Sequence, residues 1–295
     1  MRNSNLMTVE QVEEGLKHAN YIANKYISSA VADNINRYTP LIIEGDPGTG
    51  KTFLAKATAQ MLNAPLIRVQ IYEGMTYDKI LYDYDYQRQL LTAQIMKPAF
   101  ENAFKEKTLQ EALDVTKNVN FYGKDFLLER PIMQALTSEK PCVLLIDEID
   151  KASEELEYSL LQLLEEFRID VPQYGVVECN GAPPHVFLTS NAYRELSEAL
   201  KRRCNYLYLD RKTEVEICEI LTLQANIDKD MAKSVAHCLY NIQQLPLKQT
   251  PSIAEAIPWA EFLAENKDTH VEDTLFMLAK NKKDMEMIIE SGYAK

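Results

Sequence analysis

Short apolar runs alternate with amphipathic segments along the first two thirds of the chain. The apolar runs lie at residues 41–43, 65–72, 142–146, 186–188 and 206–209. Runs of this length and composition are typical of buried parallel strands. Between them, residues 51–63 and 153–167 show helical spacing of apolar positions. Strands that alternate with helices predict an α/β fold with a parallel sheet flanked by helices.

Three further segments complete this part of the chain. Thr8 and Gln11 have the spacing of a capping box, which predicts a helix whose apolar positions recur from Val9 to Ala23. Residues 73–140 predict a polar, tyrosine-rich and largely helical insert, and residues 169–180 predict a hairpin.

The strand pattern stops after residue 210, and the helical pattern continues. Helices are predicted at residues 215–226, 229–245 and 273–280. Capping boxes at residues 213–216 and 252–255 add two helix starts. We therefore expect two domains: an α/β domain at residues 1–210 and an all-helical domain at residues 211–295. The length of 295 residues fits this division at about 150 residues per domain.

The net charge of the chain limits the kinds of binding that we expect of it. The chain carries 32 Lys and Arg against 44 Asp and Glu, for a formal net charge of -12. Broad nonspecific nucleic-acid binding is therefore not expected, because it needs a basic surface that displaces counterions from phosphate.

Other residue types exclude further classes. The five cysteines show no C-x-x-C spacing and the four histidines are dispersed, so we expect neither a disulfide framework nor a metal held by side chains alone. No apolar run approaches the about 20 residues that span a bilayer. Residues 1–14 lack the apolar core of a secretory signal. We therefore expect a cytoplasmic protein without a membrane segment.

The nine glycines are unevenly placed, and three of them fall between residues 45 and 50. They belong to a segment that satisfies the pattern G-x-x-x-x-G-K-[ST]: Gly45, Asp46, Pro47, Gly48, Thr49, Gly50, Lys51 and Thr52. Backbone N–H groups in such a loop wrap a polyphosphate at the positive end of a helix. Lys51 would reach the β- and γ-phosphates, and the Thr52 hydroxyl would bind Mg²⁺. The alternative is an ordinary glycine turn that opens a helix.

Two acids, Asp147 and Glu148, directly follow the apolar strand at residues 143–146. Asp147 is expected to hold Mg²⁺, directly or through water. Glu148 is expected to orient and deprotonate the attacking water as a general base. The alternative is that both acids only cap the next helix. Consecutive acids favour water activation over transfer to a dedicated acceptor, and the absence of an Asn-Lys-x-Asp signature favours ATP over GTP.

Two polar segments could complete this nucleotide site. Asn191 follows the strand at residues 186–188 and could hydrogen-bond the lytic water or the γ-phosphate, although Asn is also common in turns and helix caps. Arg202 and Arg203 form a basic pair in an acidic chain. A guanidinium suits phosphate oxygens, and one supplied by a neighbouring subunit can act as an arginine finger. The alternative is a solvated basic helix end that complements the helix dipole.

With these motifs in this order, the sequence resembles the AAA+ ATPases and, within them, the MoxR family. The most specific segments are residues 40–45, 88–91, 130–131 and 189–204. The resemblance implies an α/β ATPase core with a helical lid, working as a ring that is usually a hexamer. ATP would then lie between subunits, with Asn191 as sensor 1 and Arg203 as the finger.

The family also has a helical insert after the second strand and a hairpin before sensor 1, and both tend to face the ring axis or a client. The first insert begins with tyrosines and aspartates in alternation: Tyr72, Tyr77, Asp78, Tyr82, Asp83, Tyr84, Asp85 and Tyr86. Tyrosines make good binding anchors, and they also serve as ordinary packing. Both interpretations stay open at this point.

One departure from the family concerns the third lid helix. Many AAA+ proteins begin this helix with an arginine, sensor 2, that contacts the γ-phosphate. Residues 251–259 contain no arginine, and Lys248 is a weak substitute. Pro258 is expected to kink the helix, because its ring removes one backbone hydrogen bond.

We therefore predict a MoxR-like ATPase that hydrolyses ATP with Mg²⁺ and remodels or matures a partner protein. The family resemblance suggests a partner with a von Willebrand factor A domain. Two alternatives remain: an AAA+ motor or loader that acts on DNA, and a nucleotide-switched assembly module with little turnover.

Overall fold

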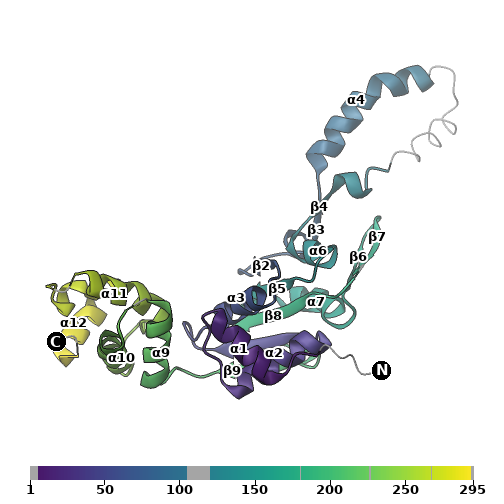
Figure 1. The fold of residues 1–295 in the computed structure, drawn as a ribbon. Helices are drawn as coiled ribbons and strands as arrows, with labels where there is room; N and C mark the ends of the chain where they lie inside the picture. The colour runs from purple at the N-terminus through teal and green to yellow at the C-terminus, as the bar shows by residue number, and fades with distance from the viewer. Residues whose placement is uncertain (1–5, 105–119, 180, 226, 267, 294–295) are drawn as a thin grey trace.

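The computed structural model describes residues 6–104, 120–179, 181–225, 227–266 and 268–293. At its centre lies a five-stranded sheet (Figure 1). Its strands are β1 (Leu41–Gly45), β2 (Leu66–Gln70), β5 (Val143–Asp147), β8 (His185–Ser190) and β9 (Asn205–Leu209). They run parallel in the order β2-β5-β8-β1-β9. The predicted α/β fold with a parallel sheet flanked by helices is confirmed.

The strand register brings the carboxyl ends of the strands to one edge of the sheet. Gln70 pairs with Asp147, and Glu44 pairs with Ser190. Parallel strands need crossover connections, which leave a crevice at this edge where the strand order reverses. The polar residues that follow β1, β5 and β8 therefore meet in space although they are far apart in the sequence.

Alternate side chains of each strand bury against opposite faces of the sheet. Leu41, Ile43 and Phe187 point to the face covered by α1 (Val9–His18), α2 (Lys25–Arg37) and α3 (Lys51–Met61). Each such aliphatic side chain contributes about 1.5–3 kcal/mol by leaving water. The strands are apolar on both faces because helices cover both.

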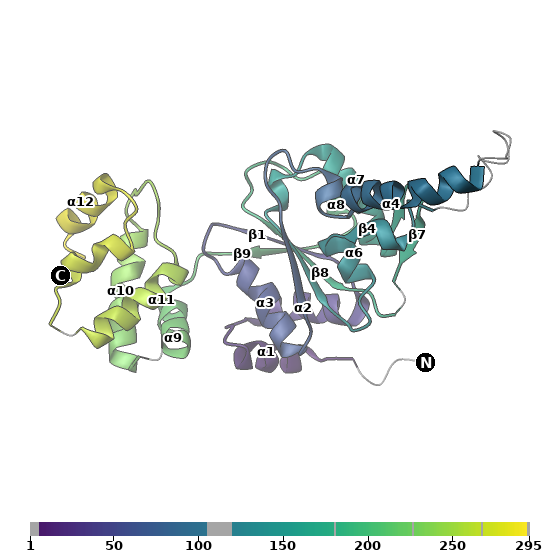
Figure 2. The same ribbon diagram turned by 90° about the horizontal axis from the view of Figure 1, so that it is seen from above.

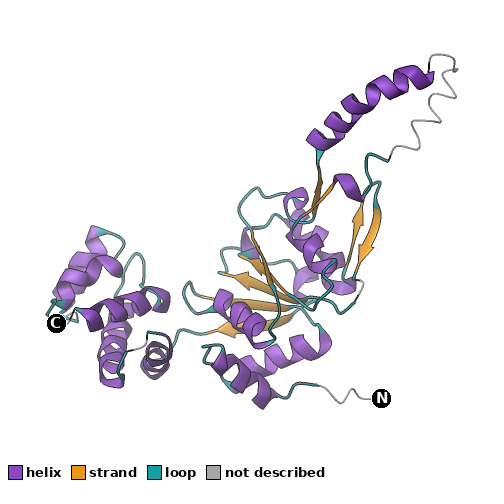
Figure 3. Ribbon diagram, turned by 45° about the horizontal axis from the view of Figure 1, so that its top comes forward, coloured by secondary structure: helices purple, strands orange, loops and turns teal. Residues whose placement is uncertain are grey.

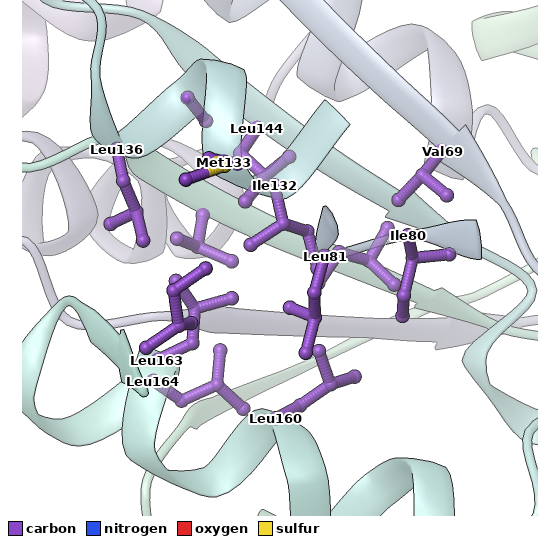
Figure 4. Close-up of a cluster of buried hydrophobic side chains, with 14 of the residues drawn as sticks. Val69, Ile80, Leu81, Ile132, Met133, Leu136, Leu144, Leu160, Leu163 and Leu164 are labelled. Atoms are coloured by element: carbon purple, nitrogen blue, oxygen red, sulfur yellow. The ribbon is translucent and has the colours of Figure 1, made fainter. Parts of the chain in front are cut away.

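The opposite face carries α6 (Pro131–Leu136), α7 (Glu154–Glu166) and the short α8 (Glu198–Lys201). Figure 4 shows Leu144 of the sheet among Ile132 and Met133 of α6, with Leu160 and Leu163 of α7 nearby. Ser153 caps α7 by accepting from the Leu156 N–H, which fixes where the helix begins after the acidic segment.

The amino-terminal helix ends earlier than its apolar pattern predicts. Thr8 and Gln11 form the expected capping box, but α1 ends at His18. Asn20 then adopts a left-handed φ of 62°, a conformation that Asn tolerates better than most residues. Tyr21 still packs in the core, which explains why the apolar positions continue beyond the helix.

The predicted insert at residues 73–140 contains, besides helices, an antiparallel ribbon that the sequence did not predict. It holds the short turns η1 (Tyr77–Lys79) and η2 (Lys124–Phe126), α4 (Tyr86–Phe104), α6, and an antiparallel ribbon of β3 (Tyr82–Tyr84) and β4 (Leu127–Glu129). The helix α4 projects away from the sheet beyond this ribbon (Figures 1 and 3). Residues 105–119 of the insert lie outside the described residues.

The insert tyrosines divide into two groups. Tyr82 and Tyr84 are buried in the ribbon, because alternate strand residues face the core. Tyr72, Tyr77 and Tyr86 are exposed. Packing therefore explains two of the tyrosines, and a surface role stays open for the other three.

The predicted hairpin is confirmed as β6 (Arg168–Val171) and β7 (Gly175–Glu178), while Asn180 lies outside the described residues. The Tyr84 hydroxyl donates to the Pro172 carbonyl oxygen at 2.8 Å. This bond joins the hairpin to the ribbon, so the two insertions are physically linked.

The carboxyl-terminal third is helical and packs beside the sheet beyond β9 (Figure 2). It contains α9 (Glu214–Gln224), α10 (Lys229–Gln243), α11 (Ile253–Glu265), η4 (Val271–Met277) and α12 (Lys282–Ser291). Both predicted capping boxes are present. The helix predicted at residues 273–280 is wrong: this stretch is mostly the 3-10 segment η4, and α12 follows it.

A separate apolar core holds these helices together around Trp259, which is 1% exposed. Its indole N–H donates to the Thr274 hydroxyl at 2.7 Å. Pro258 lies inside α11, which continues through it. No described helix combines the length and apolar composition needed to cross a membrane.

Candidate functional site

A cavity of about 490 Å³ opens at the carboxyl edge of the sheet, between the sheet and the carboxyl-terminal helices. Most of the predicted site residues line it: Pro47, Gly48, Thr49, Gly50, Lys51, Thr52, Asp147, Glu148 and Asn191. Gly45 ends β1 and Asp46 follows it, and neither is among the described residues that line this cavity; Asp46 lines a second cavity. The loop between β1 and α3 and the acids after β5 therefore meet in one pocket.

The loop depends on glycine at specific positions. Gly48 and Gly50 have φ values of 83° and 95°, which side chains rarely adopt. A Cβ atom at Gly48 would also lie 2.4 Å from the Ser252 Cβ. The residue that caps the start of α11 therefore lies directly against the loop.

Lys51 is buried at the first position of α3, with 7% of its surface exposed. Its Nζ donates to the Gly45 and Asp46 carbonyl oxygens at 2.6 and 2.9 Å. Burial lowers the pKa of Lys51, and the carboxylates of Asp150, Asp46, Asp147 and Glu148 oppose that shift. A buried ammonium that is held only by carbonyl oxygens is suited to exchange them for phosphate oxygens.

Thr52 and Asp147 lie together beside this lysine. The Thr52 hydroxyl donates to Asp147 Oδ1 at 3.0 Å, and the Thr189 hydroxyl donates to the same oxygen at 2.5 Å. A hydroxyl and a carboxylate are oxygen donors of the kind that Mg²⁺ prefers. The donor set at this position therefore fits the predicted metal.

Arg68 contacts the other oxygen of Asp147, which the sequence analysis missed. Its Nε and Nη2 donate to Oδ2 at 3.0 and 2.5 Å. Arg68 and Gln70 are two residues apart on β2, so they lie on one face at the end of the strand. Polar residues at alternate positions of a predicted strand were the sequence signal from which this contact could have been found.

Glu148 is held at the rim of the pocket with a left-handed φ of 60°. Its Oε2 accepts from Lys151 Nζ at 2.8 Å and from Gln70 Nε2 at 3.3 Å. Its backbone N–H donates to the Thr189 hydroxyl at 2.9 Å. Gln70 and Lys151 thus position the carboxylate, and Thr189 holds the backbone of Glu148.

The Asn191 loop is anchored by Asp150, a buried acid two residues after Glu148. Asp150 Oδ2 accepts from the Asn191 and Tyr193 backbone N–H groups, both at 3.0 Å. Between them Ala192 has a φ of 59°, and its N–H donates to the Ser190 hydroxyl. These contacts hold a strained turn that places Asn191 at the pocket.

The two predicted arginines are not among the described residues that line the pocket. Arg203 Nε pairs with Glu165 Oε2 at 2.7 Å, and its Nη1 donates to the Ala199 carbonyl oxygen at 2.9 Å. Arg202 is exposed. Neither arginine therefore serves the pocket of its own chain in this arrangement.

Part of the pocket lining is apolar. Ile22, Ile220 and Ile257 contribute to it, beside the rings of Tyr21 and Phe53, which are tilted by 33° with centroids 5.9 Å apart. The Tyr21 hydroxyl is buried without a hydrogen-bond partner among the described residues. Burial raises the pKa of Tyr21, so its hydroxyl keeps its proton. An apolar slot with a few polar groups is the usual setting for a flat heterocycle.

Lys248 does not line this pocket. It lies in a second cavity of about 640 Å³ on the other side of the loop, with Arg211 and Lys280. Lys212 lines both cavities, and its Nζ lies 3.3 Å from Glu216 Oε1. Lys212 is thus a cation shared by the two cavities that the sequence did not single out.

A phosphate-binding loop between a strand and a helix, with acids at the tip of a nearby parallel strand, defines a P-loop nucleotide-binding protein. Residues 40–204 match the family of the AAA domain, dynein-related subfamily, over more than half of the chain. The chain belongs to this AAA family, which supports an ATP-driven activity. No curated protein matches the chain.

Proposed function

We propose that the protein hydrolyses ATP with Mg²⁺ and uses the energy to remodel a partner protein. The observation that carries this proposal is the convergence of Lys51, Thr52, Asp147 and Glu148 on one pocket. Lys51 and the loop N–H groups bind the phosphates. Thr52 and Asp147 would hold the metal, which would neutralise phosphate charge when bound.

Glu148 and Asn191 are assigned to the attacking water. A carboxylate within reach of a water can orient it and accept its proton. Asn191 lines the same pocket and can hydrogen-bond the water or the γ-phosphate. The apolar slot at Tyr21 receives the base, and we propose adenine because no guanine signature is present.

The finer assignments rest on the resemblance to MoxR proteins. We propose a ring, usually a hexamer, in which Arg203 or its neighbour Arg202 reaches the ATP of an adjacent subunit. We propose an ATPase core at residues 1–210, a helical lid at residues 211–295, and a client with a von Willebrand factor A domain. Five free cysteines support a reducing, cytoplasmic location.

The remodelling proposal is tested by trapping the client. A Glu148→Gln chain should retain ATP and stay bound to its partner, so the partner should co-purify with it in the presence of ATP. The matched control carries Lys51→Ala in addition, and should lose both ATP and the partner. Recovery of the ATPase alone, with and without ATP, would contradict remodelling. ATPase stimulation by DNA that falls with salt would instead support the DNA motor.

The Tyr21→Phe variant tests the assignment of the apolar slot. Loss of this hydroxyl is expected to weaken ATP and ADP binding about 5–10-fold, because a net hydrogen bond contributes about 1 kcal/mol. Tripolyphosphate binding should not change, because this ligand lacks the base that is assigned to the apolar slot. Calorimetric titration measures all three ligands. Thermal unfolding of the free variant should show no loss of stability, because the removed group has no partner.

A further inference from the structure

The Asp147 carboxylate is fully occupied by side chains of its own chain. Oδ1 accepts from the hydroxyls of Thr52 and Thr189, and Oδ2 accepts two N–H groups of Arg68. The Asp147 side chain is only 4% exposed. A carboxylate this deeply buried needs a cation, because leaving water without a partner is costly. Arg68 supplies a cation in direct contact, and the buried ammonium of Lys51 interacts with the same carboxylate through space.

Arg68 is loosely anchored apart from this pair. It lies on β2, an edge strand, and its side chain is 41% exposed. Among the described residues, its guanidinium also donates from Nη2 to Gln70 Oε1 at 3.3 Å. A guanidinium that is partly open to water loses less than a buried one when it leaves a carboxylate, because solvent replaces some of its hydrogen bonds. Arg68 can therefore give way to a stronger cation without disturbing the buried core.

The same carboxylate is the residue assigned to the metal. Mg²⁺ binds carboxylate oxygens, directly or through its own waters, and it carries twice the charge of a guanidinium. Mg²⁺ would approach Asp147 from the pocket, and Arg68 lines the same pocket. Occupation by one therefore weakens occupation by the other.

We propose that Arg68 is an internal competitor of Mg²⁺ at Asp147, and that Mg·ATP must displace it. Arg68 holds the buried carboxylate when no metal is bound and so sets the Mg²⁺ concentration at which the site fills. This inference rests on the proposed function of the pocket. It predicts that nucleotide binding without metal does not depend on the pairing of Arg68 with Asp147.

The test is a Mg²⁺ titration of the binding of a fluorescent ATP analogue. Arg68→Gln should lower the half-saturating Mg²⁺ concentration about 5–10-fold, because Asp147 then keeps an uncompensated charge for the metal. Arg68→Lys should shift it less in the same direction, because a lysine keeps the charge but not the two-point contact. Arg37→Gln is the matched control: it removes an arginine of α2 that is paired with Asp33 and 77% exposed, and should not shift the midpoint.

Mn²⁺ binding followed by electron paramagnetic resonance gives a readout independent of fluorescence and of turnover. Mn²⁺ should bind most tightly to the Arg68→Gln chain, less tightly to Arg68→Lys, and most weakly to the wild-type chain. A midpoint that is unchanged or higher in both Arg68 variants would overturn the competition. A wild-type chain that binds no ATP analogue at any Mg²⁺ concentration would instead overturn the proposed function itself, so the two failures are distinguishable.

Discussion

Replacing Glu148 by Gln is expected to lower the rate of ATP hydrolysis about 10²–10⁴-fold, because the amide cannot accept a proton from water. The amide keeps the size of the carboxylate and can keep one hydrogen bond to Lys151. ATP affinity should therefore stay within about threefold of the wild-type value, since the lost interaction acts on the transition state.

Phosphate release under saturating Mg·ATP measures this effect, and a binding titration gives the affinity. Glu178→Gln is the control, because it removes an exposed carboxylate on the hairpin, which is not among the described residues that line the nucleotide pocket. If the wild-type chain hydrolyses ATP no faster than Glu148→Gln, Glu148 is not a general base. The protein would then be a nucleotide-switched assembly module.

The local part of the site was predictable from the sequence. A glycine loop and a pair of acids each follow an apolar strand within a few residues, so their positions depend on short-range geometry. Thr8, Thr213 and Ser252 likewise mark helix starts, because a capping box is complete within four residues.

The contacts that arrange the acids were not predictable in the same way. Arg68 and Asp147 are 79 residues apart, and they meet only because β2 and β5 are adjacent in the sheet. No single segment of the sequence reveals the order of the strands in the sheet. Asp150 was also missed, because an acid beside a turn gives no sign of the distant N–H groups it accepts.

Errors in element type had a different origin. The helix predicted at residues 273–280 has a helical apolar pattern, but most of this stretch forms 3-10 turns around Thr274, whose hydroxyl donates to the Val271 carbonyl oxygen and accepts from Trp259. The hydrogen bond between Thr274 and the buried Trp259 thus outweighed the local preference for an α-helix. The insert was misjudged because alternating Tyr and Asp were not recognised as a strand pattern at residues 82–84.

Replacing Arg203 by Ala is expected to lower ATP hydrolysis about 10³–10⁵-fold if it acts as a finger, because a guanidinium stabilises charge that develops on the γ-phosphate. Arg203 lies away from the pocket of its own chain, paired with Glu165. It can only act on the nucleotide of another subunit. The loss should leave ATP binding largely intact, and the Glu165 pair is too exposed for its loss to unfold the chain.

Mixing two inactive variants tests whether this arginine acts between subunits. A ring assembled from equal amounts of Arg203→Ala and Glu148→Gln chains contains interfaces where an intact Glu148 faces an intact Arg203. Roughly one interface in four is of this kind in a heterologous ring with random assembly, so the mixture should recover a substantial fraction of wild-type hydrolysis. Phosphate release before and after subunit exchange measures this recovery.

Arg202→Ala is the comparison variant. If it lowers hydrolysis more than Arg203→Ala does, the finger is Arg202. Failure of every mixture to exceed the separate variants would mean that the arginine acts within one chain or not at all.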